Sequence, residues 1–181
     1  MTYVFRFLGR RVYFFFYHLG SFSQLLWQTI KSLADFRTYS TLVPEQMLRI
    51  GVESIPVVVY IAGFAGMVTS IQSSENFTDF VPLYIIGTVV EKGVLRELSA
   101  VLTALVLAGR VGASIAAELG TMKVTEQIDA LETLAFNPVS YLIVPRVLAG
   151  VVMFPVLTVF AALVGIVAGW LTAISVMDIS T

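Results

Sequence analysis

Residues 91–138 read EKGVLRELSAVLTALVLAGRVGASIAAELGTMKVTEQIDALETLAFNP, and this stretch decides the fold. Within it, residues 98–117 form a run of 20 residues in which Arg110 is the one charge. A helix of about 20 apolar residues crosses the hydrocarbon core of a bilayer. After Gly120 the sequence becomes polar, with apolar residues recurring at helical spacing. We therefore expect a membrane span that leaves the bilayer at 118–120 and continues into a short amphipathic helix.

The composition agrees with a membrane protein. The chain has 181 residues, of which 57% are hydrophobic and 13% charged, whereas soluble domains carry about 25% charged residues. A net charge of −1 gives no reason to expect nucleic acid as a partner. With no Cys, a single His and no Walker motif, the sequence indicates no metal site, no catalytic residues and no nucleotide cofactor bound by this chain.

The charge pattern predicts three spans in an all-α membrane protein, over 54–74, 83–119 and 145–177. Cations in loops near the ends of spans mark the cytoplasmic side. Six of them precede the first span, whereas residues 73–82 contain none, which places the N-terminus in the cytoplasm. The helix expected over 121–135 then lies on the same side as the N-terminus.

Aromatic residues and interspersed cations dominate residues 3–33, where no uncharged run is long enough to span. Because aromatic rings and cations favour the headgroup level, we expect one or two amphipathic helices lying on the membrane. A distorted first span is the alternative.

Small residues recur at every fourth position of the second span, in two rows. The rows are Ala108, Gly112, Ala116 and Gly120, and Gly109, Ala113 and Ala117. Rows of this kind let two membrane helices approach closely, although Gly and Ala are common in such helices in any case.

Charged residues at membrane depth indicate function, because the bilayer makes them costly. Arg96 and Glu97 lie near the outer end of the second span, where snorkelling to the interface is the alternative reading. Arg110 lies near mid-depth. For Arg110 we expect either a substrate role or a structural ion pair, for example with Glu118 of a neighbouring chain.

The segment from RELSAVLTALVLAGRVGAS to AELGTMKVTEQIDALE resembles the signature region of MlaE-type permeases, the membrane subunits of lipid-moving ABC transporters. The aromatic N-terminal segment, GFAGMV in the first span and PRVLAG before the third extend the resemblance over most of the chain.

The resemblance implies that the 3–33 segment is an interfacial elbow helix and that 121–135 is a coupling helix bound to a separate ABC ATPase subunit, which would hold the ATP. Its implied contacts are Thr125, Glu126, Gln127, Ile128, Asp129, Leu131 and Glu132. It also implies a lipid cavity between two permease copies, lined here by Leu95, Arg96, Glu97, Leu98, Val101 and Leu102.

The other implied partners are an MCE-domain lipid-binding protein and membrane lipids. The implied location is the bacterial inner membrane, with the plastid inner envelope as the second choice. The family's RELGP motif is RELSA here, with Ser99 and Ala100 in place of Gly and Pro, which alters the cavity expected beside it. Family members usually have five spans, so we expect this chain to be a fragment or a truncated product.

Two other functions fit the residues without the resemblance. One is an ion or proton conductor that uses Glu91, Glu97 and Arg110 as relay points. The other is a membrane scaffold whose acidic helix recruits a soluble protein. The clustering of charge at the outer end of the second span argues against a continuous relay.

Overall fold

The computed structural model describes residues 2–33, 40–76, 88, 92–93, 97 and 99–177. The described residues form helices, turns and short connections, and no strand occurs among them. Within the described ranges, three segments are long and apolar enough to cross a membrane: Val43–Ser73, Ser99–Val124 and Val139–Ser175. The expected all-α class with three spans is therefore confirmed.

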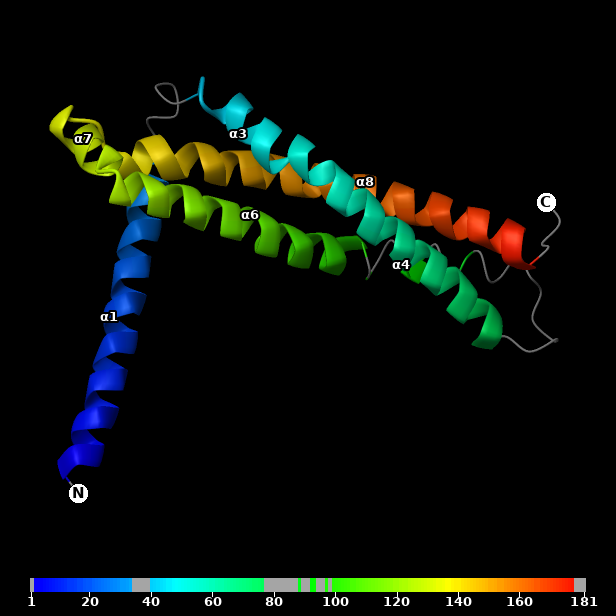
Figure 1. The fold of residues 1–181 in the computed structure, drawn as a ribbon, viewed down its shortest axis with the longest axis horizontal. Helices are drawn as coiled ribbons and strands as arrows, with labels where there is room; N and C mark the ends of the chain where they lie inside the picture. The colour runs from blue at the N-terminus through cyan, green and yellow to red at the C-terminus, as the bar shows by residue number, and fades with distance from the viewer. Residues whose placement is uncertain are drawn as a thin grey trace.

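The three long helices lie side by side and form an elongated bundle (Figure 1). They are α4 (Ile55–Asn76), α6 (Ser99–Val124) and α8 (Val144–Met177). A short helix, α3 (Val43–Ile50), and a single 3₁₀ turn, η2 (Val52–Ser54), lead into α4. Pro56 occupies the first turn of α4, where the missing N–H has no helical acceptor to lose.

The closest approach in the bundle is between α4 and α8, the pair with the most extensive contact. A Cβ atom added to Gly66 would collide with the backbone of Gly165. Small residues let membrane helices approach to backbone contact, which is the main source of helix association in lipid. Gly66 of the first span and Gly165 of the third therefore set the spacing of these two helices.

Buried aliphatic side chains from all three spans fill the space between the helices. Four of them, Val58, Leu107, Val144 and Leu157, are each at most 2% exposed. Ala62, Ala149 and Ala161 belong to the same buried cluster. The buried face of α6 carries Thr103, Leu107 and Val111. This face lies opposite the two rows of small residues.

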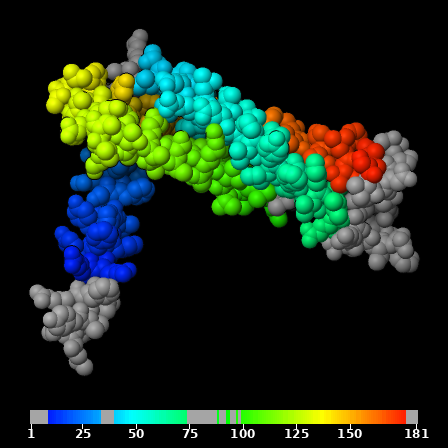
Figure 2. Space-filling view, viewed as in Figure 1, coloured from blue at the N-terminus to red at the C-terminus, as the bar shows by residue number. Residues whose placement is uncertain are grey.

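The N-terminal helix α1 (Thr2–Ser32) leaves one end of the bundle and runs crosswise to α4, α6 and α8 (Figures 1 and 2). Its C-terminal end contacts η4 (Val139–Ile143), a π-helical turn that precedes α8. Of its side chains from Gly9 onward, Thr29 and Ser32 are buried and the others are exposed. This crosswise direction is the one expected of an interfacial helix beside membrane spans, and the interfacial position of α1 stays a prediction.

The third span is longer than the bilayer is thick. The 34 residues of α8 extend about 51 Å at 1.5 Å per residue, against roughly 30 Å of hydrocarbon. The helix continues through Pro155, which lacks the N–H that would close the ladder at that point. Part of α8 must therefore tilt or extend beyond the hydrocarbon.

Candidate functional site

A short helix, α7 (Gln127–Thr133), forms the tip of the molecule at the end where α1 joins the bundle (Figure 1). The sequence predicted one helix over 121–135, but residues 121–124 are the last turn of α6. The chain then turns at Thr125 and Glu126, where Glu126 adopts a left-handed conformation with φ of 58°. The turn separates α7 from the spanning helix.

The C-terminal end of α7 is closed by a Schellman motif without glycine. Ala135 has φ of 61°, and its N–H donates to the carbonyl of Glu132. The N–H of Phe136 donates to the carbonyl of Leu131 at 3.1 Å. These two bonds satisfy the last carbonyls of the helix and fix the direction in which the chain returns to the bundle.

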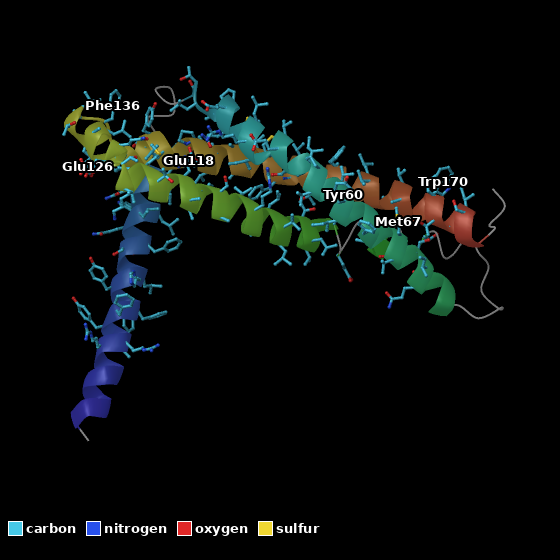
Figure 3. The ribbon with its side chains drawn as sticks, viewed as in Figure 1. Tyr60, Met67, Glu118, Glu126, Phe136 and Trp170 are labelled. Atoms are coloured by element: carbon cyan, nitrogen blue, oxygen red, sulfur yellow. The ribbon has the colours of Figure 1, made fainter. Side chains whose placement is uncertain are left out.

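None of the residues of α7 is buried. Thr125, Glu126, Gln127, Asp129 and Glu132, the polar contacts expected from the sequence, are all exposed. The two apolar anchors, Ile128 and Leu131, are half-buried. Val124, Leu134 and Phe136 add exposed apolar surface around the tip, where Figure 3 labels Glu126 and Phe136. The tip therefore presents both acidic and apolar groups at its surface.

Behind the tip, one carboxylate connects three helices. Glu118 of α6 lies 3.0 Å from Arg49 of α3 through Oε1 and 2.9 Å from Arg146 of α8 through Oε2. Arg146 is 6% exposed, and its Nε and Nη1 have no hydrogen-bond partner among the described residues. Figure 3 labels Glu118 at this end of the bundle. The ion pairs hold α3, α6 and α8 together beneath α7.

Arg110, which the sequence placed at mid-depth, lies farther along the same face of α6. Its Nη1 donates to Ser54 Oγ, and its Nη2 lies 3.6 Å from Glu53 Oε2. Arg110 and Glu118 therefore both have ion-pair partners within the chain. Sequence reasoning did not single out Arg49, Glu53, Ser54 or Arg146 as partners. The sequence did contain one indication of their role: each of these four residues lies in or beside an otherwise apolar segment.

Of the residues expected to line a lipid cavity, Val101 and Leu102 lie at the other end of α6, about 35 Å from the tip at 1.5 Å per residue. Leu95, Arg96 and Leu98 lie outside the described residues, and Glu97 is exposed. Val101 is 64% exposed, whereas Leu102 is half-buried and faces α4 across a pocket of about 10 Å³. Glu97 and Val101 are thus accessible from outside the bundle, and Leu102 belongs to its interior.

Among the described residues, no three His, Asp or Glu side chains gather as ligands for a metal ion. The arrangement instead defines a class: a polytopic α-helical membrane protein with a crosswise N-terminal helix and an exposed helix at one end. Residues 43–181 match the family model described as Permease MlaE. The chain belongs to this permease family.

Individual relatives agree with this assignment. A probable ABC transporter permease protein of Rickettsia felis is 40% identical over 174 residues, which cover 96% of this chain and 67% of that protein. The intermembrane phospholipid transport system permease protein MlaE of Haemophilus influenzae is 36% identical over 92% of this chain and 64% of its own length. The chloroplastic protein TRIGALACTOSYLDIACYLGLYCEROL 1 of Arabidopsis thaliana is 41% identical over 75% of this chain and 39% of its own. This chain thus spans about two thirds of the length of these two bacterial relatives.

Proposed function

We propose that this chain is the permease subunit of an ABC transporter that moves phospholipid across or out of the bacterial inner membrane. In this proposal the chain is not itself an enzyme, since a separate ATPase subunit binds and hydrolyses ATP. The name of the Haemophilus influenzae relative, a phospholipid transport permease, supports the substrate class. The names of the Rickettsia relatives support the ABC transporter class.

The observation that carries the proposal is the exposed α7 at the end of the bundle where the chain's cations are concentrated. Arg10, Arg11 and Lys31 lie on α1, which joins the bundle at this end, and Arg49 lies on α3. Cation-rich segments beside membrane spans stay in the cytoplasm. An acidic helix is not attracted to an anionic inner leaflet, so a cytoplasmic protein is its better partner. In the proposed complex, α7 is the coupling helix that contacts the ATPase.

The second permease copy would pack against α6. Ala108, Gly109, Gly112, Ala113, Ala116, Ala117 and Gly120, which make up the two small-residue rows, are all exposed in the single chain. Among the described residues, and leaving out the local helix backbone, Cβ atoms built on Gly109, Gly112 and Gly120 meet no atom within 4 Å. The cavity between the copies would take lipid near Arg96, Glu97 and Val101, and an MCE-domain protein would exchange that lipid on the outer side.

Charge reversal on α7 tests the proposal. Glu126→Lys with Asp129→Lys should release the proposed ATPase subunit while leaving the permease in the membrane. Gln24→Lys with Gln28→Lys is the control, because it adds positive charge to exposed positions of α1 at the same end of the bundle. Copurification from detergent-solubilised membranes measures the complex. An ATPase that remains fully bound to the α7 variant would refute the coupling assignment.

A further inference from the structure

A polar pocket of about 310 Å³ opens between α3 and α6, and none of its lining residues belongs to α7 or to the set expected to line the lipid cavity. It is lined by Gln46, Arg49, Glu53, Arg110, Ser114 and Glu118. Polar linings of this size are unusual on an apolar membrane bundle, because each charge at membrane depth is costly unless it serves a purpose.

The charged side chains that line this pocket are partly exposed to solvent, whereas the side chain of Arg146 is buried. The side chains of Arg49, Arg110 and Glu53 are 49%, 34% and 63% exposed. The contact between Arg110 and Glu53 is 3.6 Å, longer than a hydrogen bond, so neither group is strongly held by the other. A guanidinium has five N–H donors and binds phosphate well, which leaves Arg110 able to contact an anion.

The pocket carries two arginines and two glutamates, so its lining has no net charge. Charge complementarity therefore favours a ligand that carries both signs over an anion alone. A phosphate ester with an attached ammonium group fits this lining, with its phosphate on the arginines and its ammonium on Glu53.

A second pocket, of about 540 Å³, adjoins the first and is almost wholly apolar. The two share Ile50, Val111 and Ile115 as lining residues, and Val147, Val151 and Phe154 extend the apolar surface along α8. A polar pocket beside an apolar one matches a ligand with a charged head and a hydrocarbon tail, as lipid sites combine a few polar groups with apolar walls.

The pocket lies at the level of one leaflet. Arg110 is eight residues from Glu118 along α6, or about 12 Å farther from the end that bears α7. With α7 in the cytoplasm, Glu118 is near the cytoplasmic surface and Arg110 is deeper. The charged lining thus runs from the cytoplasmic headgroup level toward the middle of the bilayer.

We propose that the pocket between α3 and α6 binds the headgroup of a zwitterionic phospholipid from the cytoplasmic leaflet. The leaflet assignment rests on the orientation given under the proposed function. The site is separate from the cavity near Glu97, and it gives lipid a polar path into the bundle from the cytoplasmic side.

Thiol protection tests the site, because the chain contains no cysteine of its own. Ser114→Cys places a thiol in the pocket, and Ala113→Cys places one beside it on the same helix, at an exposed position that does not line the pocket. Each variant of the full chain is purified in detergent micelles without any ATPase. The rate of maleimide labelling is then measured with short-chain phosphatidylethanolamine, short-chain phosphatidylglycerol, phosphoethanolamine or inorganic phosphate.

We expect phosphatidylethanolamine at about ten times its Kd to slow labelling of Cys at 114 about tenfold, since the unoccupied fraction falls by that factor. Labelling at 113 should not change, and phosphatidylglycerol should protect less. Arg110→Gln or Glu53→Gln should weaken protection. The double change Glu53→Arg with Arg110→Glu keeps an ion pair between the two positions but should not restore protection of the thiol. If the two residues mattered only as a structural ion pair, the double change would restore protection.

Equal slowing at 113 and 114, or no slowing at 114, would overturn the site. Equal protection by phosphoethanolamine would assign the pocket to a soluble phosphate ester and overturn the lipid source. Because no ATPase is present, a failure of the coupling assignment leaves this result unaffected, and a failure here leaves the coupling assignment standing.

Discussion

Glu118 of α6 and Arg146 of α8 form an ion pair of 2.9 Å, although they lie 28 positions apart in the sequence, with the whole of α7 between them. The pair closes the loop that carries α7. Arg146 is 6% exposed and Glu118 is its ion-pair partner among the described residues. A motion of α7 that reaches the bundle must therefore pass through the two helix ends that this pair joins.

Removing the carboxylate should destabilise the bundle strongly. Glu118→Gln leaves the buried guanidinium of Arg146 without its counter-charge, and breaking one partner of a buried pair costs about 3–5 kcal/mol. Glu45→Gln is the control, since Glu45 pairs with Arg49 at 3.7 Å with 62% of its side chain exposed. An exposed pair contributes about 0–1 kcal/mol. Unfolding of the purified protein in mixed micelles measures the difference, and similar losses in both variants would contradict the reading.

The close contact of α4 and α8 makes a second prediction. Gly66→Ala places a methyl group against the backbone of Gly165, so the helices must move apart, and overpacking of this kind costs about 1–3 kcal/mol. Gly63→Ala is the matched control on the same helix, because the nearest atom to its new Cβ is Val164 Cγ1 at 4.0 Å. Unfolding of both variants in micelles tests this, and a Gly66→Ala protein as stable as Gly63→Ala would show that the helices are not held at this spacing.

The spans could be predicted from sequence because length and hydropathy alone determine what crosses a bilayer. The partners of the charged residues could not. Arg49, Glu118 and Arg146 lie on three different helices, and only the packing of those helices brings them together. Nothing in the spacing along one helix records such a contact.

The turn before α7 was missed for a different reason. Thr125 and Glu126 have no glycine or proline beside them, and the stripe of apolar residues continues through them at helical spacing. Positive φ at Glu126 and Ala135 is unusual for residues with a Cβ atom. The exposure of α7 did follow from the sequence, because Glu126, Asp129 and Glu132 left it too polar to be buried.

The position of α1 leads to a prediction about its depth. Val12, Phe15, Leu19, Phe22 and Leu26 share one face of the helix and are all exposed in the single chain. If this face rests at the boundary of headgroups and acyl chains, Trp27, which is 71% exposed, lies at shallow depth. In a Trp170→Phe background, the fluorescence of Trp27 is measured in bilayers of lipids brominated at different depths. Lipids with bromines near the headgroups should quench it more than lipids with bromines near the bilayer centre. The control is Trp27→Phe, in which Trp170 alone reports. Stronger quenching of Trp27 by the deep bromines would show that α1 is a span.

The small-residue face of α6 makes the last prediction, on the second copy of the chain. Gly112 is exposed with no atom within 4 Å of a built Cβ, so a partner helix can approach it closely. Because the chain has no cysteine, Gly112→Cys is the single thiol of its variant and should form a disulfide-linked dimer in oxidised membranes. The control is Tyr60→Cys on α4, which is at least as accessible at 69% exposed and belongs to another face (Figure 3). A disulfide forms only when the two Cα atoms come within about 7 Å, so a specific contact through α6 should cross-link Gly112→Cys efficiently. Without such a contact, chance collisions in the membrane would cross-link both variants weakly and to the same extent. Non-reducing electrophoresis measures the dimer. Equal dimer from the two variants would show that α6 does not form the contact between copies.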